Sequence, residues 1–324
     1  YFTGFITESV EPIVWFAVFL LLTAAVVFIG VQKGIEKAST ILMPILIILI
    51  VCISIFCATR PGALAGVKYY LLPDIKHFSA TTVLAAMGQL FYSMSLAMGI
   101  MITYGSYMKK EDDLRDSVRK IEIFDTVVAL LAGLMIVPSV FAFSGGSKEA
   151  LSKGPSLMFV TMPKVFNSMK IGSLIGAGFF ILVLFAALTS AISLLETNVS
   201  IICDKLHWSR KKSTVVATLY CLIVGGLISL GYGPLSFIKI IGMNLLDFFD
   251  FISNSVLMPI VAMLTCIFIG YIVKPKTIID EVELGGKTFK EKKFYVVMLK
   301  YVAPVCLLLI LLFAVSEALG LIKV

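Results

Sequence analysis

Residues 88–107 read GQLFYSMSLAMGIMITYGSY, an apolar stretch that carries three glycines and several hydroxyl side chains, Ser93 and Ser95 among them. The apolar run around it, 80–108, is too long for one straight crossing of a bilayer. Unpaired backbone cannot face lipid, so small polar residues in such a run favour a broken helix whose freed carbonyls and hydroxyls face a cavity. Close helix–helix packing by small residues is the plainer alternative.

The composition of the whole chain supports a membrane protein. Of the 324 residues, 59% are apolar and 15% are charged, and the mean hydropathy is +1.02. So few charges cannot form the hydrated shell that keeps a soluble protein dispersed. The composition therefore excludes a soluble enzyme, a disordered protein and a disulfide-stapled secreted domain, and leaves an all-α membrane protein with several transmembrane helices.

Apolar runs predict eight transmembrane helices within one membrane domain covering residues 1–324. The predicted helices are 11–31, 39–57, 80–108, 118–144, 172–203, 212–232, 241–273 and 294–320. Between the fourth and fifth, the stretch GPSLMFVTMPKVF (154–166) contains Pro155 and Pro163 and is too short to span. We expect it to form a re-entrant or surface-lying hairpin.

Lysine and arginine are concentrated in the loops that follow the first, third, fifth and seventh runs. By the positive-inside rule these loops face the cytoplasm, which places Tyr1 and Val324 on the outer side of the plasma or inner membrane. The chain starts at Tyr1 without a signal-peptide pattern, so the sequence predicts that upstream transmembrane helices are missing.

Other function classes find little support in the residues. The formal net charge of +7 comes from these loops and not from a basic stripe interleaved with aromatic residues, so we expect no nucleic-acid partner. The six cysteines lie in or beside apolar runs without metal-ligand spacing, as small apolar side chains do. Phosphate-binding loops, nucleophile elbows and zinc-binding histidine pairs are absent from the sequence, which predicts no enzyme and no cofactor.

Polar groups inside the apolar runs are the candidate functional residues, because they are costly in lipid. Asp125 lies in the run IFDTVVALLAGL (123–134), where a lone carboxylate needs a cation or a donor; solvation near the cytoplasmic end is the alternative. Ala186, Thr189 and Ser190 have helical spacing and share one face. Their hydroxyl and carbonyl oxygens suit a small hard cation, although such hydroxyls also bond back to their own helix.

Four stretches together, 88–107, 123–134, 154–166 and ALTSAISLLE (187–196), resemble the neurotransmitter:sodium symporter family. The chain is most similar to the eleven-span bacterial amino-acid transporters of that family, from their fourth span to their eleventh. The resemblance implies an inverted-repeat fold with broken helices. It assigns 1–57 to the end of the first repeat, 80–273 to the second five-helix repeat and 294–320 to the last span, with the first three spans missing.

The resemblance also implies a role for individual residues, and these roles rest on it alone. Substrate-binding positions would be Tyr92, Ser93, Ser95, Met98, Ser190 and Leu194. The first sodium ion would be bound by Ser93 and Asp125, and the second by the Ala186 carbonyl with Thr189 and Ser190. Gln89 and Asp250 match the extracellular gate, and Tyr107 and Asp204 match the cytoplasmic gate. The break in the helix would fall at Ser93–Met98.

Two departures from the family pattern concern the pocket and the counter-charge. Ala97 stands where many members have glycine, which would narrow the pocket. Asp125 supplies a carboxylate where animal members use a bound chloride held partly by a serine; the matching position here is Ala129.

The function that follows is sodium-coupled symport of an amino acid, apolar or aromatic, by alternating access. Sodium ions, an amino acid as the small-molecule substrate and the lipid bilayer would be the partners, with oligomeric state left open. A proton-coupled carrier in which Asp125 titrates and a non-transporting membrane paralogue remain alternatives.

Overall fold

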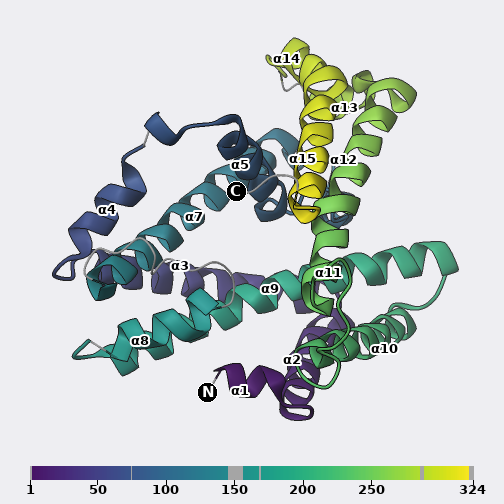
Figure 1. Cartoon of the computed structure of the whole chain (residues 1–324). Helices are drawn as coiled ribbons and strands as arrows, with labels where there is room; N and C mark the ends of the chain where they lie inside the picture. The colour runs from purple at the N-terminus through teal and green to yellow at the C-terminus, as the bar shows by residue number, and fades with distance from the viewer. Residues whose placement is uncertain (1, 74, 145–155, 168, 285–287, 321–324) are drawn as a thin grey trace. The chain divides into compact units, whose positions relative to one another are not determined.

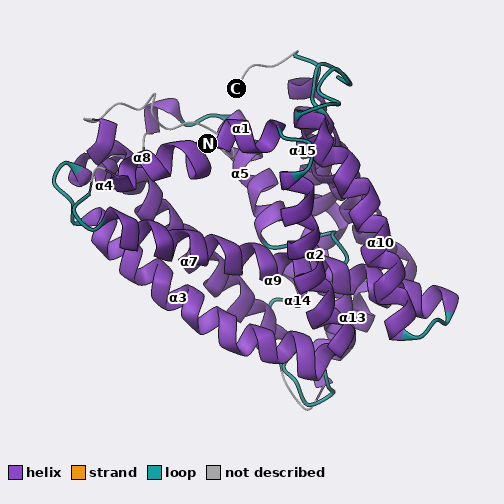
Figure 2. Cartoon of the chain, turned by 90° about the horizontal axis from the view of Figure 1, so that it is seen from below, coloured by secondary structure: helices purple, strands orange, loops and turns teal. Residues whose placement is uncertain are grey.

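The computed structural model describes residues 2–73, 75–144, 156–167, 169–284 and 288–320 (Figure 1). These residues are helical almost throughout, and their β-type pairing is limited to one isolated bridge between Ile240 and Met243 (Figure 2). The prediction of an all-α protein is therefore confirmed. Tyr1, Pro155 and Val324 lie outside the described residues, so the expectations that name them are not tested.

Seven helices of the described chain are long and apolar enough to cross a membrane. They are Glu11–Ile29, Lys33–Ala58, Leu114–Phe143, Gly172–Leu206, Arg210–Tyr232, Leu245–Val273 and Lys292–Ala318. Each coincides with a predicted run, with ends that differ by a few residues in either direction. Where the helix is longer than the run, hydropathy does not register the polar turns that extend beyond the hydrocarbon. The remaining predicted run, 80–108, is divided into two short helices and is not among the seven, so the count of eight is not confirmed.

The chain divides into two compact units, which we describe separately. Unit 1 consists of Tyr1–His77 and Phe124–Val224, and unit 2 of Phe78–Ile123 and Gly225–Val324. The prediction of one membrane domain is not tested by this division.

Unit 1 is built on the long helix α9, along which α2, α3 and α8 pack. A buried cluster that includes Ile50 of α3, Met135 of α7, Phe166 of α8 and Phe179 of α9 joins these helices. The elements of unit 1 are α1 (Phe2–Thr7), α2 (Glu11–Ile29), η1 (Val31–Glu36), α3 (Lys37–Ala58), α4 (Ala63–Leu71), η2 (Ile75–His77), most of α7 (Leu114–Ser144), η4 (Leu157–Thr161), α8 (Met162–Asn167), α9 (Gly172–Leu206) and most of α10 (Arg210–Ser229).

The stretch predicted to be a hairpin is helical over the part that the structure describes. Residues 156–167 form one continuous segment in which η4 leads into α8. Met162, Val165 and Phe166 are buried, and the Phe166 ring lies 5.2 Å from that of Phe179. This face of the segment is therefore packed against α9 and does not lie on the surface.

Unit 2 contains the divided run and the last two candidate spans, in which α12 packs against α15 and α15 against α5. Its elements are α5 (Ala80–Ser93), α6 (Ile100–Ser106), η5 (Leu230–Tyr232), α11 (Leu245–Asp250), η6 (Phe251–Leu257), α12 (Met258–Ile267), η7 (Phe268–Val273), α13 (Pro275–Val282), α14 (Lys292–Val297), η9 (Met298–Val302) and α15 (Ala303–Ala318). The segments η6, η7 and η9 are π-helical.

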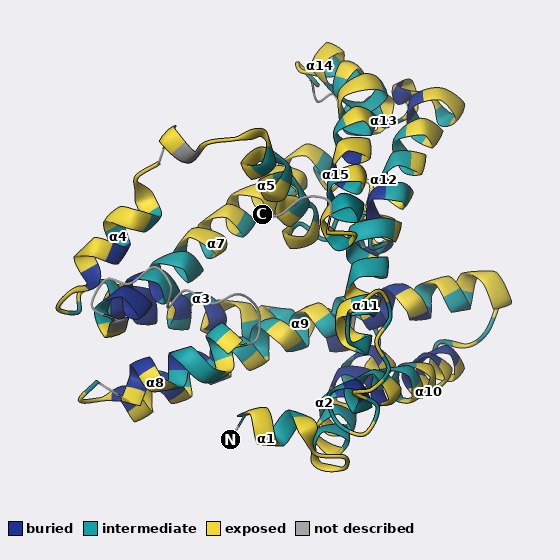
Figure 3. Cartoon of the chain, viewed as in Figure 1, coloured by how far each residue is buried: buried dark blue, intermediate teal, exposed yellow. Residues whose placement is uncertain are grey.

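Much of the surface of the long helices is exposed (Figure 3), and many of the exposed side chains are large and apolar. Leu21 on α2, Ile48 on α3, Ile223 on α10 and Leu312 on α15 are each more than half exposed. Exposed apolar side chains on this scale are typical of helices that face lipid, since water would disfavour them.

Candidate functional site

The run 80–108 of unit 2 is broken between α5 and α6. Helix α5 ends at Ser93 and α6 begins at Ile100. Within the break, the Ser95 N–H donates to the Tyr92 carbonyl and the Leu96 N–H to the Phe91 carbonyl, both at 3.0 Å, so the regular helical pattern stops here. The break predicted at Ser93–Met98 is thus observed, one residue further along.

The backbone of the break alternates into the left-handed region. Ser95 has φ of +53°, Ala97 of +60° and Gly99 of +80°. Glycine adopts this region freely, and Gly99 provides the N-cap of α6. For Ser95 and Ala97 the same conformation costs about 1–2 kcal/mol each. Strain of this kind persists where the surrounding fold enforces it, and it is concentrated at functional sites.

Five further predicted site residues flank this break in unit 2. Tyr92 and Ser93 are exposed in the last turn of α5, Gln89 lies one turn earlier, Met98 lies in the break, and Tyr107 caps the end of α6. The positions predicted to bind substrate, 92, 93, 95 and 98, therefore lie within one turn of the break.

Asp250, the other predicted member of the extracellular gate, is the last residue of α11. Gln89 and Asp250 belong to the same unit, but within the described chain no hydrogen bond joins their side chains. The Asn254 amide donates to the Asp250 carboxylate at 2.6 Å instead. The sequence analysis did not identify Asn254 as a candidate functional residue. It could have done so, because an amide inside an apolar run is costly unless it has a partner, and Asp250 lies one helical turn before it.

Unit 1 contains the second group of predicted site residues, along α9. Ala186, Thr189 and Ser190 lie on one face of this helix with Leu194 one turn further on, and Asp204 is exposed in its last turn. This helix therefore brings together all three residues that the resemblance assigns to the second sodium ion.

The Thr189 hydroxyl bonds back to its own helix. It donates to the carbonyls of Phe185 at 3.1 Å and Ala186 at 3.0 Å. A hydroxyl that donates still has lone pairs with which to accept or to coordinate a cation. The Ala186 carbonyl and Thr189 hydroxyl oxygens are therefore neighbours on the helix, and their predicted role as sodium ligands stays a prediction.

Asp125 lies in α7, within the part of that helix that belongs to unit 1, and its side chain is half-buried. Ser93 belongs to unit 2. The pairing of these two residues on the first sodium ion, and that of Tyr107 with Asp204 at the cytoplasmic gate, draw on both units and stay predictions.

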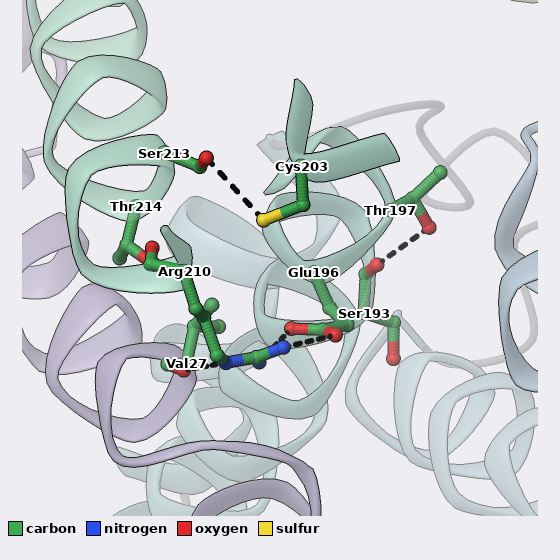
Figure 4. Close-up of polar contacts among 8 residues, drawn as sticks. All are labelled: Val27, Ser193, Glu196, Thr197, Cys203, Arg210, Ser213 and Thr214. Carbon is green, nitrogen blue, oxygen red and sulfur yellow. Dashed lines mark hydrogen bonds and ion pairs between the residues drawn. The ribbon is translucent and has the colours of Figure 1, made fainter. Parts of the chain in front are cut away.

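An ion pair between α9 and α10, with its carboxylate fully buried, was not predicted from the sequence. The Glu196 side chain is 0% exposed and meets the Arg210 guanidinium at the start of α10 with both carboxylate oxygens (Figure 4). The Arg210 Nε also donates to the Val27 carbonyl of α2 at 3.1 Å (Figure 4). One guanidinium therefore holds three helices of unit 1 together. A carboxylate in an apolar helix, the signal that singled out Asp125, applied equally to Glu196.

Comparisons with known proteins place this geometry among sodium-dependent transporters. The model of the sodium:neurotransmitter symporter family matches residues 6–321. An uncharacterized sodium-dependent transporter of Bacillus subtilis is 36% identical over 96% of this chain and 68% of its own length. An uncharacterized sodium-dependent transporter of Haemophilus influenzae is 32% identical over 95% of this chain and 65% of its own length. The sodium- and chloride-dependent glycine transporter 1 of Xenopus laevis is 29% identical over 90% of this chain and 47% of its own length.

A solved structure is similar over the same range. The crystal structure of MhsT in complex with L-phenylalanine superimposes with a TM-score of 0.86 at 37% sequence identity, covering 97% of this chain and 70% of that one. The chain thus spans about half to two thirds of the length of the curated relatives cited here.

Proposed function

Because this chain belongs to the sodium:neurotransmitter symporter family, we propose that the protein uses a sodium gradient to carry an amino acid across the membrane. The family consists of sodium-dependent membrane transporters and not of enzymes. Sodium ions are accordingly the coupling ions. The substrate, the ion sites and the transport cycle are the parts that we propose.

The observation that carries the proposal is the break between α5 and α6. A helix interrupted inside the membrane leaves carbonyl and N–H groups unpaired, and such groups are stable there only if they line a cavity or meet a ligand. Ser95 and Ala97 adopt left-handed backbone conformations to form this interruption. Secondary transporters place substrate and coupling ions at such discontinuous helices near the membrane midplane.

In this proposal the ligands come from the break with the end of α5, from α9, and from Asp125 of α7. Tyr92, Ser93, Ser95 and Met98 contact the substrate from the break, and Leu194 with Ser190 from α9. The Ala186 carbonyl, Thr189 and Ser190 bind one sodium ion, and Ser93 and Asp125 serve the other. Gln89 and Asp250 gate the extracellular path, and Tyr107 and Asp204 the cytoplasmic path.

We propose an apolar or aromatic amino acid as the substrate. Met98, Leu194 and Tyr92 offer apolar and aromatic surface and no charge to pair with a charged side chain. The solved complex of MhsT with L-phenylalanine is a related protein with an amino acid of this class.

The architecture of the proposal follows the family. The pair α5 and α6 together make an eighth crossing, and the eight correspond to spans four to eleven of an inverted-repeat fold. Alternating access would move the broken helix relative to the other helices around the binding site. The basic loops would face the cytoplasm.

Uptake of a radiolabelled amino-acid panel by cells that express the gene product containing these residues tests this function. We expect leucine- and phenylalanine-like substrates to accumulate in sodium buffer and to remain at background in choline buffer. Accumulation in choline buffer at low external pH would favour proton coupling. No accumulation of any amino acid, with the protein present at the cell surface, would favour the non-transporting alternative.

A further inference from the structure

Lys300 is a charged residue inside a candidate membrane span, and its stem is held against the preceding span. It lies in the π-helical turn η9, two turns inside the helix that begins at Lys292. Its ammonium is 5.1 Å from the centre of the Tyr271 ring in η7, and the Tyr271 hydroxyl donates to the Lys300 carbonyl at 3.2 Å. Gly270 permits this approach, since a Cβ there would lie 3.3 Å from Lys300 Cγ.

Lys300 has no carboxylate within ion-pairing distance among the described residues. An ammonium at membrane depth is costly unless it finds an anion or reaches the interface. The face of Tyr271 offers a cation–π contact, but that ring is itself about half exposed. The charge of Lys300 therefore lacks a full counter-charge from the described chain.

The surrounding segment of unit 2 is already depleted of free acids. Lys292 pairs with Glu283 at 2.7 Å, and Arg115 with Glu291 at 2.7 Å. The Lys292 ammonium and then the Phe289 N–H lower the pKa of the Glu283 carboxyl from its ordinary value. Glu283 and Glu291 are thus occupied.

What remains at this end of the last two spans is an excess of positive charge. Among the described residues of 268–302, two acids, Asp280 and Glu281, form no ion pair. Five lysines in the same range also form no ion pair. These lysines are Lys274, Lys276, Lys290, Lys293 and Lys300. The nearby apolar side chains of Ile272, Val297, Tyr301 and Val305 are each half exposed or more.

We propose that Lys300, held by Tyr271, binds the phosphate of an anionic phospholipid. The ammonium donates to a phosphate oxygen, and the exposed apolar side chains of η7, η9 and α15 accommodate the acyl chains. The excess of lysines selects an anionic headgroup over a zwitterionic one, since anionic lipids gain from each nearby cation. We call Tyr271 and Lys300, together with the exposed lysines Lys274, Lys276, Lys290 and Lys293, the lipid clamp. It is independent of the proposed substrate and sodium sites.

Native mass spectrometry of the detergent-purified protein, titrated with phosphatidylglycerol or phosphatidylcholine, tests the lipid clamp. We expect the first phosphatidylglycerol to bind more tightly than phosphatidylcholine. Lys300→Met should weaken that first step about tenfold, as for loss of one charged hydrogen bond, and leave phosphatidylcholine binding unchanged. Lys300→Arg should retain the preference, and Lys33→Met, an exposed lysine of unit 1, should behave as wild type.

A substitute variant and a competitor complete the experiment. Lys300→Gln replaces Lys300→Met if the latter does not elute as a folded, helical protein. Millimolar inorganic phosphate, added as competitor, should not displace the lipid, because free phosphate lacks the acyl chains; displacement would indicate a phosphate site and overturn the lipid assignment. Wild-type affinity for phosphatidylglycerol in the Lys300 variants, or an equal loss for both lipids, would also overturn it.

Discussion

At the residue scale, Ala97 is the clearest case of backbone strain in the candidate site, because this alanine adopts φ of +60°. Replacing it by glycine relieves about 1–2 kcal/mol of strain and costs about 0.4–1 kcal/mol through the more flexible unfolded chain. We therefore expect Ala97→Gly to stabilise the protein by up to about 1 kcal/mol, measured as a higher thermal midpoint in detergent. Ala86→Gly, in the regular part of α5, is the matched control and should lower the midpoint. A lower midpoint for Ala97→Gly would show that the methyl group has a packing role that outweighs the strain.

The hydroxyls of α9 give the second prediction. Removing Thr189 or Ser190 Oγ takes one neutral oxygen from the proposed sodium shell, which contains no carboxylate to compensate. We expect Thr189→Ala, and to a lesser degree Ser190→Ala, to raise the sodium concentration for half-maximal uptake about fivefold, as for loss of one modest polar contact. Ser193→Ala is the control, because the Ser193 hydroxyl donates to the Thr189 backbone carbonyl at 3.1 Å and has no proposed role in binding sodium. Unchanged sodium dependence in both variants would show that these hydroxyls do not bind sodium and only form hydrogen bonds within their own helix.

The third residue-scale prediction concerns the charge of Asp125. Two sodium ions in a low-dielectric site need a nearby negative charge, and the proposal takes it from this carboxylate and not from chloride. Wild-type uptake should therefore persist in gluconate buffer, and Asp125→Asn should abolish it there. Combining Asp125→Asn with Ala129→Ser, one helical turn further along α7, should restore uptake when chloride is added. Chloride-dependent uptake by the wild type would contradict this role.

At the element scale, the Glu196–Arg210 pair fixes the turn between α9 and α10 and reaches α2 through Val27. Removing Arg210 leaves the fully buried Glu196 carboxylate without compensation, at about 3–5 kcal/mol. Removing Glu196 leaves Arg210, which is partly exposed, with the Val27 carbonyl as a remaining hydrogen-bond partner, so this loss is the smaller of the two. Arg210→Met should destabilise the protein strongly and Glu196→Leu less so, and the double variant should cost much less than their sum. Thermal or chemical unfolding in detergent measures the cycle. Additive losses would mean that the two side chains stabilise the helices independently.

Elements differ in how far the sequence predicts them. Hydropathy located seven long helices because lipid exposure requires an apolar run wherever a helix crosses. A break somewhere in the run 80–108 was favoured by its excess length and small polar residues, whereas its position, observed at 94–99, was predicted from the family resemblance alone. The π-helical segments η6, η7 and η9 were not, because a local insertion leaves composition and periodicity nearly unchanged.

Side-chain partners were the least predictable feature. Glu196 and Arg210 are brought together by the turn between two helices, and Lys300 and Tyr271 by the packing of two spans. Neither contact follows from spacing along one helix. The roles assigned to Ser93, Asp125 and Asp204 came from the family resemblance and remain proposals.

At the scale of the whole molecule, the chain is a member of the sodium:neurotransmitter symporter family, and its described part contains seven helices long and apolar enough to cross a membrane. Unit 1 carries the oxygens of α9, and unit 2 carries the helix break. If sodium and substrate bind to the same state of the protein, each must raise the affinity for the other by the same factor. Coupling of sodium to substrate is therefore the central claim.

The most direct measurement is amino-acid uptake into proteoliposomes that contain the gene product carrying these residues, under an imposed sodium gradient. The account predicts that an inward sodium gradient drives concentrative uptake of an apolar or aromatic amino acid. It also predicts that potassium in place of sodium, with or without an inward proton gradient, gives only background. Equal uptake without sodium, or uptake driven by the proton gradient alone, would contradict it.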